Sequence, residues 1–285
     1  RNYDFREIKI MLKVIRIKGL FSRFDYDIEM KEEGITILTG PNGFGKSTVF
    51  SLIEAVAAAD AEAIKRIPFE ESVLVCEDKT ITLQKDGDML FVDGAPLNNG
   101  GMQNLIADKS ETGAVKCVGG RRLLDRALND WEKLKEYIED VREVPKRLKA
   151  RLKSGGERAA EKAELFINLL KDKFNFKTPV LDAAEGLEFI DADGIRLKFS
   201  DLTAGEAQLT AFYYELLFET PDKALILIDE PEISMHIVWQ MRLVCDLEKI
   251  CAALKGAKAI VATHSPQILG GHRSLQVDLG EQYER

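Results

Sequence analysis

The chain opens with short runs in which apolar and polar residues alternate. Residues 12–18 alternate valine and isoleucine with lysine and arginine, a pattern typical of a β-strand. Residues 26–30 predict a second strand after a turn at 19–24, and residues 35–38 are apolar and β-branched, as in a buried strand. Three more β-like runs lie at 73–76, 80–83 and 89–92, and Asp86-Gly87 between the last two predicts a hairpin turn.

A helical region follows these strands. Apolar residues recur at helical spacing from residue 121 to Val141, and Pro145 interrupts that periodicity. A second helical run spans 146–173, with a weak point at Ser154-Gly155-Gly156. Residues 121–173 therefore predict a helical lobe inserted into the domain, and they are too few for a long coiled-coil arm.

Strands and helices alternate in the last third of the chain. Two β-like runs flank a hairpin signal at Asp193-Gly194, and the predicted elements are strands at 187–190 and 195–199, a helix at 205–218, a strand at 224–228, a helix at 237–254 and a strand at 259–262. Such alternation implies a mainly parallel sheet with helices on both faces. We therefore expect one α/β domain over residues 1–285, with a parallel core, an antiparallel β portion and the inserted lobe.

One glycine-rich stretch carries the first chemical signal. Residues 40–48 read Gly-Pro-Asn-Gly-Phe-Gly-Lys-Ser-Thr and fit the pattern of a phosphate-binding loop, G-x-x-x-x-G-K-[ST]. A predicted strand precedes the loop and a predicted helix at 49–59 follows it, which favours this interpretation over a glycine turn without a ligand. The residues expected to hold phosphate are Asn42, Gly43, Gly45, Lys46, Ser47 and Thr48, with Lys46 reaching the outer phosphates and the Ser47 hydroxyl binding Mg²⁺.

Two carboxylates follow the predicted strand at 224–228. Asp229 and Glu230 come after the uncharged run Leu-Ile-Leu-Ile, and acids at the carboxyl end of a sheet strand lie at the ligand-binding edge. Asp229 is the expected Mg²⁺ partner of Ser47, and Glu230 is placed to polarise an attacking water molecule. The alternative is a solvated acidic turn, which the phosphate-loop motif makes less favoured.

Two polar turns complete the set of candidate residues. Thr203 and Glu206 fit a capping box at the start of a helix, and this structural role is sufficient by itself. The functional alternative is that the same helix start binds a phosphate through Thr203 and the Gly205 amide. His264 follows the predicted strand at 259–262, where a neutral imidazole is placed to hold the γ-phosphate or the attacking water, although a lone histidine is usually structural.

Taken in this order, the four motifs resemble those of the ABC-type ATPases. Residues 40–48 are similar to Walker A, 202–208 to the signature motif, 225–230 to Walker B, and His264 to the switch histidine. The opening residues 14–24 resemble the Rad50, RecF and SMC branch. The runs 229–236 and 263–269 resemble stand-alone AAA-family ATPases related to the OLD family, many of which are found in bacterial anti-phage systems.

The resemblance implies a P-loop NTPase of ABC type in which two subunits sandwich ATP and Mg²⁺ head to tail. It assigns Lys46, Ser47, Asp229, Glu230 and His264 to one copy, and Thr203, Gly205 and Glu206 to the other. Within that assignment Lys46, Glu230 and His264 are the expected catalytic residues, and Ser47 and Asp229 are the expected metal ligands.

The chain also departs from the family pattern. The signature motif has Thr203 and Ala204 where serine and glycine are usual, and the glutamine loop has two candidates, Gln84 and Gln103. OLD proteins continue into a Toprim nuclease domain, whereas no further acidic cluster follows His264. A nuclease effector is therefore expected to be a separate chain.

Composition narrows the remaining classes of protein. The 285 residues are 45% hydrophobic and 31% charged, values typical of a soluble globular protein, and no apolar run reaches the roughly 20 residues of a membrane span. Residues 1–10 are too charged for a secretory signal, and Met11 is a candidate natural start. The four cysteines, Cys76, Cys117, Cys245 and Cys251, form no C-x-x-C pair and lie in apolar surroundings, which predicts buried thiols in a reduced, cytoplasmic protein.

The net charge of −8 argues against a general attraction to nucleic acid, so any such contact needs a local patch. One candidate patch surrounds Pro145 and consists of Arg142, Lys146, Arg147, Lys149, Arg151, Lys153 and Arg158, with a solvated helix face as the favoured alternative. A second candidate surface is the apolar side of the lobe around Trp131 and Tyr137, which is suited to a partner protein.

These observations predict a soluble ATPase that acts as a nucleotide-gated switch in anti-phage defence or DNA maintenance, with a separate effector such as a nuclease. Two alternatives stay open: the ATPase subunit of a membrane transporter, and a scaffold that holds ATP without hydrolysing it. The opening strands, Glu206 and the Asp-Glu-Pro-Glu run at 229–232 argue against the transporter.

Overall fold

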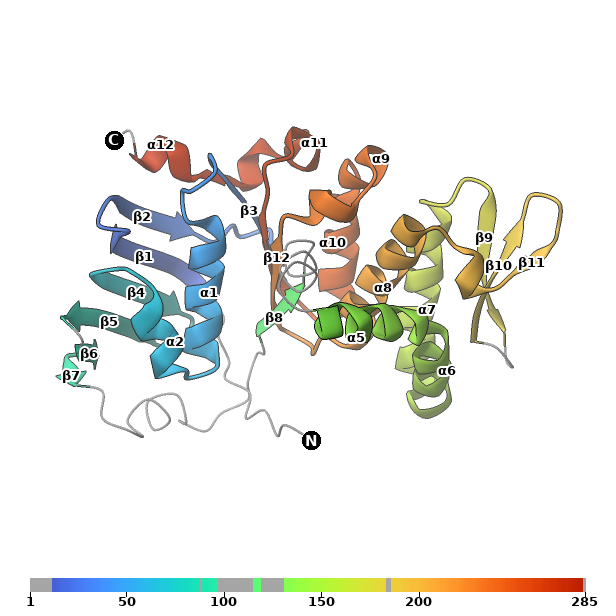
Figure 1. Ribbon diagram of the computed structural model, residues 1–285, viewed down its shortest axis with the longest axis horizontal. Coiled ribbons are helices and arrows are strands. Elements are labelled where there is room, and N and C mark those ends of the chain that lie inside the picture. Colours follow the sequence, from blue (N-terminus) through green and yellow to red (C-terminus); the bar gives the residue numbers. More distant parts are fainter. Residues whose placement is uncertain (1–11, 88, 97–114, 119–130, 183–185, 284–285) are drawn as a thin grey trace.

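A parallel β-sheet organises the part of the chain that the computed structural model describes, residues 12–87, 89–96, 115–118, 131–182 and 186–283 (Figure 1). The sheet has five strands in the order β14-β3-β13-β12-β8. Their bounds are β3 Ile35–Thr39, β8 Val115–Val118, β12 Leu225–Asp229, β13 Lys258–Ala262 and β14 Gln276–Asp278. All four pairings are parallel, so the carboxyl ends of the five strands lie at one edge.

Alternate residues of this sheet pack into two separate cores. Ile226 and Ile228 of β12 lie in the core that includes three helices, α7 Gly156–Lys171, α8 Ala204–Phe218 and α10 Leu243–Ala253. Leu225 and Leu227 of the same strand lie in the other core, against α1 Lys46–Ala57. All four β12 side chains are buried, which explains why this strand reads as an uninterrupted apolar run.

The predicted antiparallel portion has two parts. A six-stranded sheet in the order β2-β1-β4-β5-β6-β7 shares its core with α1 and the short helix α2 Ala61–Arg66. Its strands are β1 Leu12–Leu20, β2 Phe24–Glu29, β4 Glu71–Cys76, β5 Thr80–Asp86, β6 Met89–Val92 and β7 Ala95–Pro96. A three-stranded sheet at the other end of the molecule consists of β9 Lys177–Asp182, β10 Gly186–Asp191 and β11 Arg196–Leu197 (Figure 1).

The described part of the predicted helical lobe consists of α5 Trp131–Arg142, α6 Val144–Ser154 and α7. The weak point at Ser154-Gly155-Gly156 is confirmed as the break between α6 and α7, because Gly156 has φ of +59° and a Cβ on Gly155 would lie 2.7 Å from the Arg151 carbonyl oxygen. Pro145 lies in the first turn of α6, where its missing N–H costs no helical hydrogen bond.

Several elements differ from the sequence prediction. The pattern predicts neither β8 nor β9 nor α2, and the helix expected over 237–254 is two helices, α9 Ile237–Gln240 and α10. Strand β8 is missed because its four residues are too few for a pattern to stand out, and its place follows from pairing with the distant β12. The remaining elements are α11 Pro266–Leu269, α12 Leu279–Tyr283 and three 3₁₀ turns, Phe199–Asp201, Pro231–Ser234 and Arg273–Leu275. None of the helices described is both long and apolar enough to cross a bilayer.

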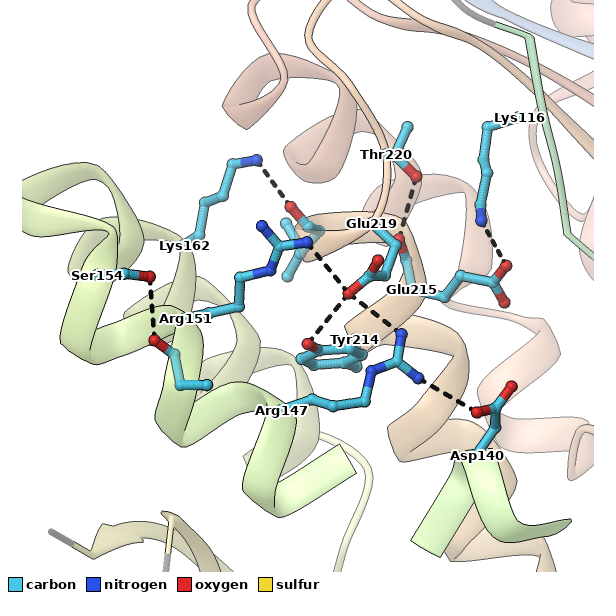
Figure 2. Close-up of polar contacts among 12 residues, drawn as sticks. Lys116, Asp140, Arg147, Arg151, Ser154, Lys162, Tyr214, Glu215, Glu219 and Thr220 are labelled. Carbon is cyan, nitrogen blue, oxygen red and sulfur yellow. Dashed lines mark hydrogen bonds and ion pairs between the residues drawn. The ribbon is translucent and has the colours of Figure 1, made fainter. Parts of the chain in front are cut away.

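A network of charges around Glu219 holds the lobe to α8 (Figure 2). The Nη2 atoms of Arg147 and Arg151 lie 3.2 and 3.5 Å from Glu219 Oε1, and the Tyr214 hydroxyl donates to the same oxygen at 3.2 Å. The Arg147 guanidinium also lies 5.2 Å from the centroid of the Tyr214 ring. Burial acts to raise the pKa of Glu219, but the two arginines and the tyrosine hydroxyl lower it below its ordinary value.

These contacts change the interpretation of the two candidate surfaces on the lobe. In the basic stretch, Arg147 and Arg151 face Glu219, Arg158 pairs with Asp222 and Lys146 pairs with Glu143. Much of its positive charge is thus offset by acids of the same chain, which weakens the case for a nucleic-acid surface. Tyr137 is partly buried against the main core, where it serves packing, and the Trp131 side chain lies outside the described residues.

The cysteines do not all match their predicted burial. Cys76 and Cys251 are buried and Cys117 is partly buried, and burial raises the pKa of the Cys251 thiol to about 12. Cys245 is exposed, so the expectation of a buried thiol is wrong at this position. The reason is that Cys245 lies outside the stripe of α10 formed by Leu243, Leu247 and Ile250, which are buried.

We expect Arg147→Gln to lower the free energy of unfolding by about 1 kcal/mol near neutral pH, because Glu219 loses an ion pair and Tyr214 loses the guanidinium. A glutamate whose pKa is lowered by folding contributes stability above the pKa it has in the unfolded chain, and this contribution is lost as the pH falls through its folded pKa. The difference from the wild type is therefore expected to be constant above about pH 5 and to shrink below about pH 4. Urea unfolding at a series of pH values measures it.

Lys153→Gln is the matched control, because it removes a charge from an exposed position on the same helix. It is expected to change the free energy of unfolding by less than about 0.5 kcal/mol throughout the pH series. A cost of Arg147→Gln that persists unchanged at about pH 3 would contradict the role assigned to Glu219.

Candidate nucleotide-binding site

The glycine-rich loop joins the end of β3 to the start of α1. Gly40, Gly43 and Gly45 have φ of +144°, +81° and +82°, backbone conformations that glycine adopts without strain. Helix α1 begins at Lys46, and its N-cap residue is Gly45, which has no side chain to cap the helix. The first amides of α1 and the positive end of its dipole therefore make the loop a site for an anion.

Two of these glycines have different surroundings. A Cβ on Gly45 would lie 2.7 Å from Leu20 Cδ2 and 3.3 Å from a ring carbon of Phe21, so the loop packs tightly against the first hairpin there. A Cβ on Gly43 would meet no atom within 4 Å. The loop is thus held firmly at Gly45 and faces open space at Gly43, as a cradle for a phosphate requires.

The Lys46 side chain lies within the loop. It is 5% exposed, and its ammonium donates to the carbonyl oxygens of Gly40 at 2.8 Å and Pro41 at 3.2 Å. A buried ammonium is costly unless it is paired, so these carbonyls hold the charge in place beside the cradle. Ser47 and Thr48 follow in the first turn of α1, both partly exposed.

Strand register brings the loop and the two acids to the same edge of the sheet. Ala262 of β13 pairs with Leu38 of β3 on one side and with Asp229 of β12 on the other. With strands about 4.8 Å apart, the backbone at Asp229 lies about 10 Å from the backbone at Leu38. The pairing continues past the strand ends, because Thr263 N–H donates to the Leu38 oxygen at 3.1 Å and Glu230 N–H donates to the Ala262 oxygen at 2.8 Å.

Glu230 and His264 meet at this edge. His264 Nε2 lies 3.8 Å from Glu230 Oε1, and 33% of the histidine side chain and 17% of the glutamate side chain are exposed. Glu230 has φ of +47°, which is unusual for a residue other than glycine, and Pro231 begins a 3₁₀ turn directly after it. The two side chains predicted to handle an attacking water are therefore within reach of each other.

The last strand and helix of the described chain support the loop. The Thr39 hydroxyl donates to Asp278 Oδ2 at 2.8 Å, and β14 pairs with β3. A Cβ on Gly40 would lie 3.3 Å from Leu279 Cβ, so this buried leucine packs directly against the loop. Further along the loop, the ring centroids of Phe44 and Tyr283 are 5.8 Å apart in an edge-to-face arrangement.

The predicted signature turn lies on a different element. Thr203 and Glu206 form the expected capping box: the Thr203 N–H and hydroxyl donate to Glu206 Oε2 at 2.8 and 2.9 Å, and Glu206 N–H donates to Thr203 Oγ1 at 3.3 Å. These residues begin α8, which packs on the face of the parallel sheet opposite to α1 (Figure 1). Within one chain, Lys46 therefore lies at the same sheet edge as the two acids and His264. The signature-turn residues Thr203, Gly205 and Glu206 lie instead at the start of α8.

Lys177 of β9 contacts the signature turn and is not singled out by sequence reasoning. Its Nζ lies 2.7 Å from Glu206 Oε2. Burial acts to raise the pKa of Glu206, but the bonds from Lys177 and Thr203 lower it below its ordinary value, so this carboxylate is charged near neutral pH. No local signal marks Lys177, because β9 is placed by its pairing with β10.

The structure describes one of the two glutamine-loop candidates, and that residue is engaged away from the loop of glycines. Gln84 lies in β5, and its amide donates to Glu71 Oε2 at 2.9 Å on the neighbouring strand β4. Gln103 lies outside the described residues.

The residues gathered at this edge fit a magnesium nucleoside triphosphate. The amides of the loop and a buried ammonium suit the phosphates, and the Ser47 hydroxyl and Asp229 carboxylate are oxygen donors of the kind that Mg²⁺ prefers. A carboxylate and an imidazole 3.8 Å apart are suited to orienting a water molecule. The arrangement can therefore bind a triphosphate and present water to it.

A protein-family model described as "AAA domain, putative AbiEii toxin, Type IV TA system" matches residues 122–270, just over half of the chain. The SMC head domain from Thermotoga maritima has a similar structure, with a TM-score of 0.52, 20% sequence identity and 91% of each chain covered. An SMC head bound to the C-winged helix domain of ScpA has a TM-score of 0.54, 13% identity and 90% of each chain covered. These similarities confirm the predicted α/β fold, which is like that of SMC head domains. Among curated proteins, none matches the sequence significantly.

The contrast between Gly45 and Gly43 predicts different costs for the same substitution. Gly45→Ala is expected to lower the free energy of unfolding by about 2–4 kcal/mol, because the new methyl group meets Leu20 in a strained backbone conformation. Gly43→Ala carries only the backbone strain and is expected to cost about 1 kcal/mol. Urea unfolding without nucleotide measures both, and equal costs would contradict the packing of the loop on Leu20.

Proposed function

The chain belongs to the family of AAA domains whose model matches residues 122–270, and on that premise we propose that it is an ATPase that binds and hydrolyses Mg²⁺-ATP as a nucleotide-gated switch. The observation that carries the proposal is the convergence of the Lys46 loop, Asp229, Glu230 and His264 at one edge of the parallel sheet. A binding module for another anion needs the loop, but it has no need of two acids and a histidine beside it.

Each residue has a role that its position supports. The loop amides and Lys46 bind the outer phosphates, and Ser47 and Asp229 hold Mg²⁺, which when bound neutralises phosphate charge. Glu230 orients the attacking water molecule. His264 contacts the γ-phosphate next to that water molecule. Positioning and electrostatics supply most of the rate, because phosphoryl transfer requires little covalent participation by the protein.

The active unit in this proposal is a homodimer or a higher oligomer that closes head to tail around ATP. Thr203, Gly205 and Glu206 of one copy then face the phosphates bound by the other. This is supported by the position of α8, which begins at these residues and lies across the sheet from α1. Binding of ATP favours the closed pair, and hydrolysis releases it.

We infer anti-phage defence as the setting, with residues 1–285 forming one ATPase domain and a separate protein, such as a nuclease, as the effector. The family description, which names a toxin of a toxin–antitoxin system, supports defence over DNA maintenance. The acids that offset the basic stretch favour an output through protein contact over one through nucleic acid. If the protein binds ATP but releases no phosphate, the alternative of a non-hydrolysing scaffold is favoured. Co-purification with a membrane protein would favour the alternative of a transporter subunit.

Glu230→Gln keeps the size of the side chain and removes its charge. We expect it to lower kcat by about 100-fold or more while ATP still binds, and to accumulate an ATP-bound dimer. Light scattering with excess Mg²⁺-ATP measures the mass, and a monomer under these conditions would contradict the dimeric site. Lys46→Ala is the paired control: it is expected to bind no ATP and to form no such dimer, and undiminished binding would show that the loop is not the site.

A mixture of two inactive variants tests whether the site is shared between copies. Gly205→Asp places a carboxylate where the partner's phosphate is expected, and the fold tolerates it because the nearest atom to the new Cβ is a Trp239 ring carbon at 3.9 Å. Each mixed dimer of Lys46→Ala and Gly205→Asp contains one intact composite site, so the mixture is expected to recover ATPase activity that neither variant has alone. No recovery, or full activity of Gly205→Asp alone, would contradict the head-to-tail arrangement.

A further inference from the structure

The carboxylate of Glu232 spans two segments beside the site. Glu232 lies in the 3₁₀ turn Pro231–Ser234, two residues after Glu230. Its Oε1 accepts the backbone N–H of His264 at 2.7 Å, and its Oε2 accepts the Thr263 hydroxyl at 2.8 Å. A carboxylate offers two strong acceptors on one rigid plane, so it fixes both the position and the orientation of the backbone at His264.

A second chain of hydrogen bonds ties the same two segments together. Thr263 is fully buried, and its Oγ1 accepts the N–H of Ser265 at 2.9 Å. The Ser265 hydroxyl donates to Gln240 Oε1 at 2.6 Å, and Gln240 Nε2 donates to the Met235 carbonyl oxygen at 2.9 Å. The turn after β13 is thus held to the segment after β12 at two points, with His264 between them.

The imidazole of His264 depends on this clamp for its place. The 3.8 Å between His264 Nε2 and Glu230 Oε1 is longer than a hydrogen bond, so that pair does not itself fix the ring. The backbone from which the ring projects is fixed instead by Glu232. Losing the clamp therefore releases the imidazole without removing any group that contacts nucleotide.

We propose that Glu232 is a positioning residue that holds His264 beside Glu230 and thereby sets the rate of ATP hydrolysis. The inference rests on the proposed function, in which Glu230 and His264 act on the attacking water. Glu232 acts only through His264, and it contributes nothing to the binding of ATP.

The test is a double-mutant cycle on kcat. Glu232→Ala is expected to lower kcat by about 10- to 100-fold, because a small displacement of a catalytic group is enough for such a loss. The Kd of Glu232→Ala for ATP is expected to stay within about 2-fold of the wild-type value. Glu232→Gln retains one hydrogen-bond acceptor, so its kcat is expected to lie between those of the wild type and Glu232→Ala. In a His264→Ala background, adding Glu232→Ala is expected to change kcat by less than about 2-fold.

The NMR signals of the histidine rings distinguish positioning of His264 from a general effect of Glu232 on stability. The chain has three histidines, so His264→Ala identifies the signal of that ring, and His272 serves as the internal reference. Glu232→Ala is expected to shift or broaden the His264 signal and to leave that of His272 unchanged. Glu248→Ala is the matched control, because it removes an exposed glutamate from α10, and it is expected to alter neither signal nor kcat.

The outcomes separate this inference from the function it rests on. An unchanged kcat in Glu232→Ala, or an equal loss in both backgrounds, would overturn the positioning role while the ATPase assignment stands. A His264→Ala variant with full kcat, or a wild type that releases no phosphate, would instead overturn the proposed function, and the positioning role with it. Thermal unfolding of each variant shows whether it is folded. If Glu232→Ala does not fold, the kcat of Glu232→Gln decides whether Glu232 has the positioning role.

Discussion

The parallel register of β3, β13 and β12 is the constraint on which the rest of the structure depends. Ala262 pairs with Leu38 and with Asp229, so three strands that are distant in sequence end at one level. A shift by one residue would exchange the two faces of a strand and move its buried side chains from one core to the other. The burial that stabilises the sheet therefore also determines which residues reach the edge proposed to bind nucleotide.

The chemistry that can be predicted from the sequence is local. The glycine loop is recognisable because positive φ at Gly43 and Gly45 and the lysine after them are needed within a few residues of each other. The capping box of Thr203 and Glu206 and the break at Gly155 are local in the same way, because each depends on groups no more than four residues away along the chain. Asp229 is found because a charged residue ends an otherwise apolar strand.

What could not be predicted depends on pairing between distant segments. Strand β8 has too short a pattern to stand out, and Lys177 reaches Glu206 only because β9 is aligned by β10. The contact of Glu232 with His264 joins residues 32 positions apart, and it becomes visible only once β12 and β13 are adjacent. The exposure of Cys245 is decided by which stripe of α10 faces the core, and an apolar neighbourhood in the sequence does not reveal that stripe.

The support of the glycine loop by β14 and Leu279 has a consequence for synthesis. Thr39 and Asp278 are hydrogen-bonded across 239 positions, and Leu279 packs against Gly40. The ribosome makes the loop early, yet one edge of β3 stays without its neighbour until β14 has left the exit tunnel. A nascent chain therefore carries a glycine loop that lacks one of its supporting walls until β14 and Leu279 have been translated and have packed against it.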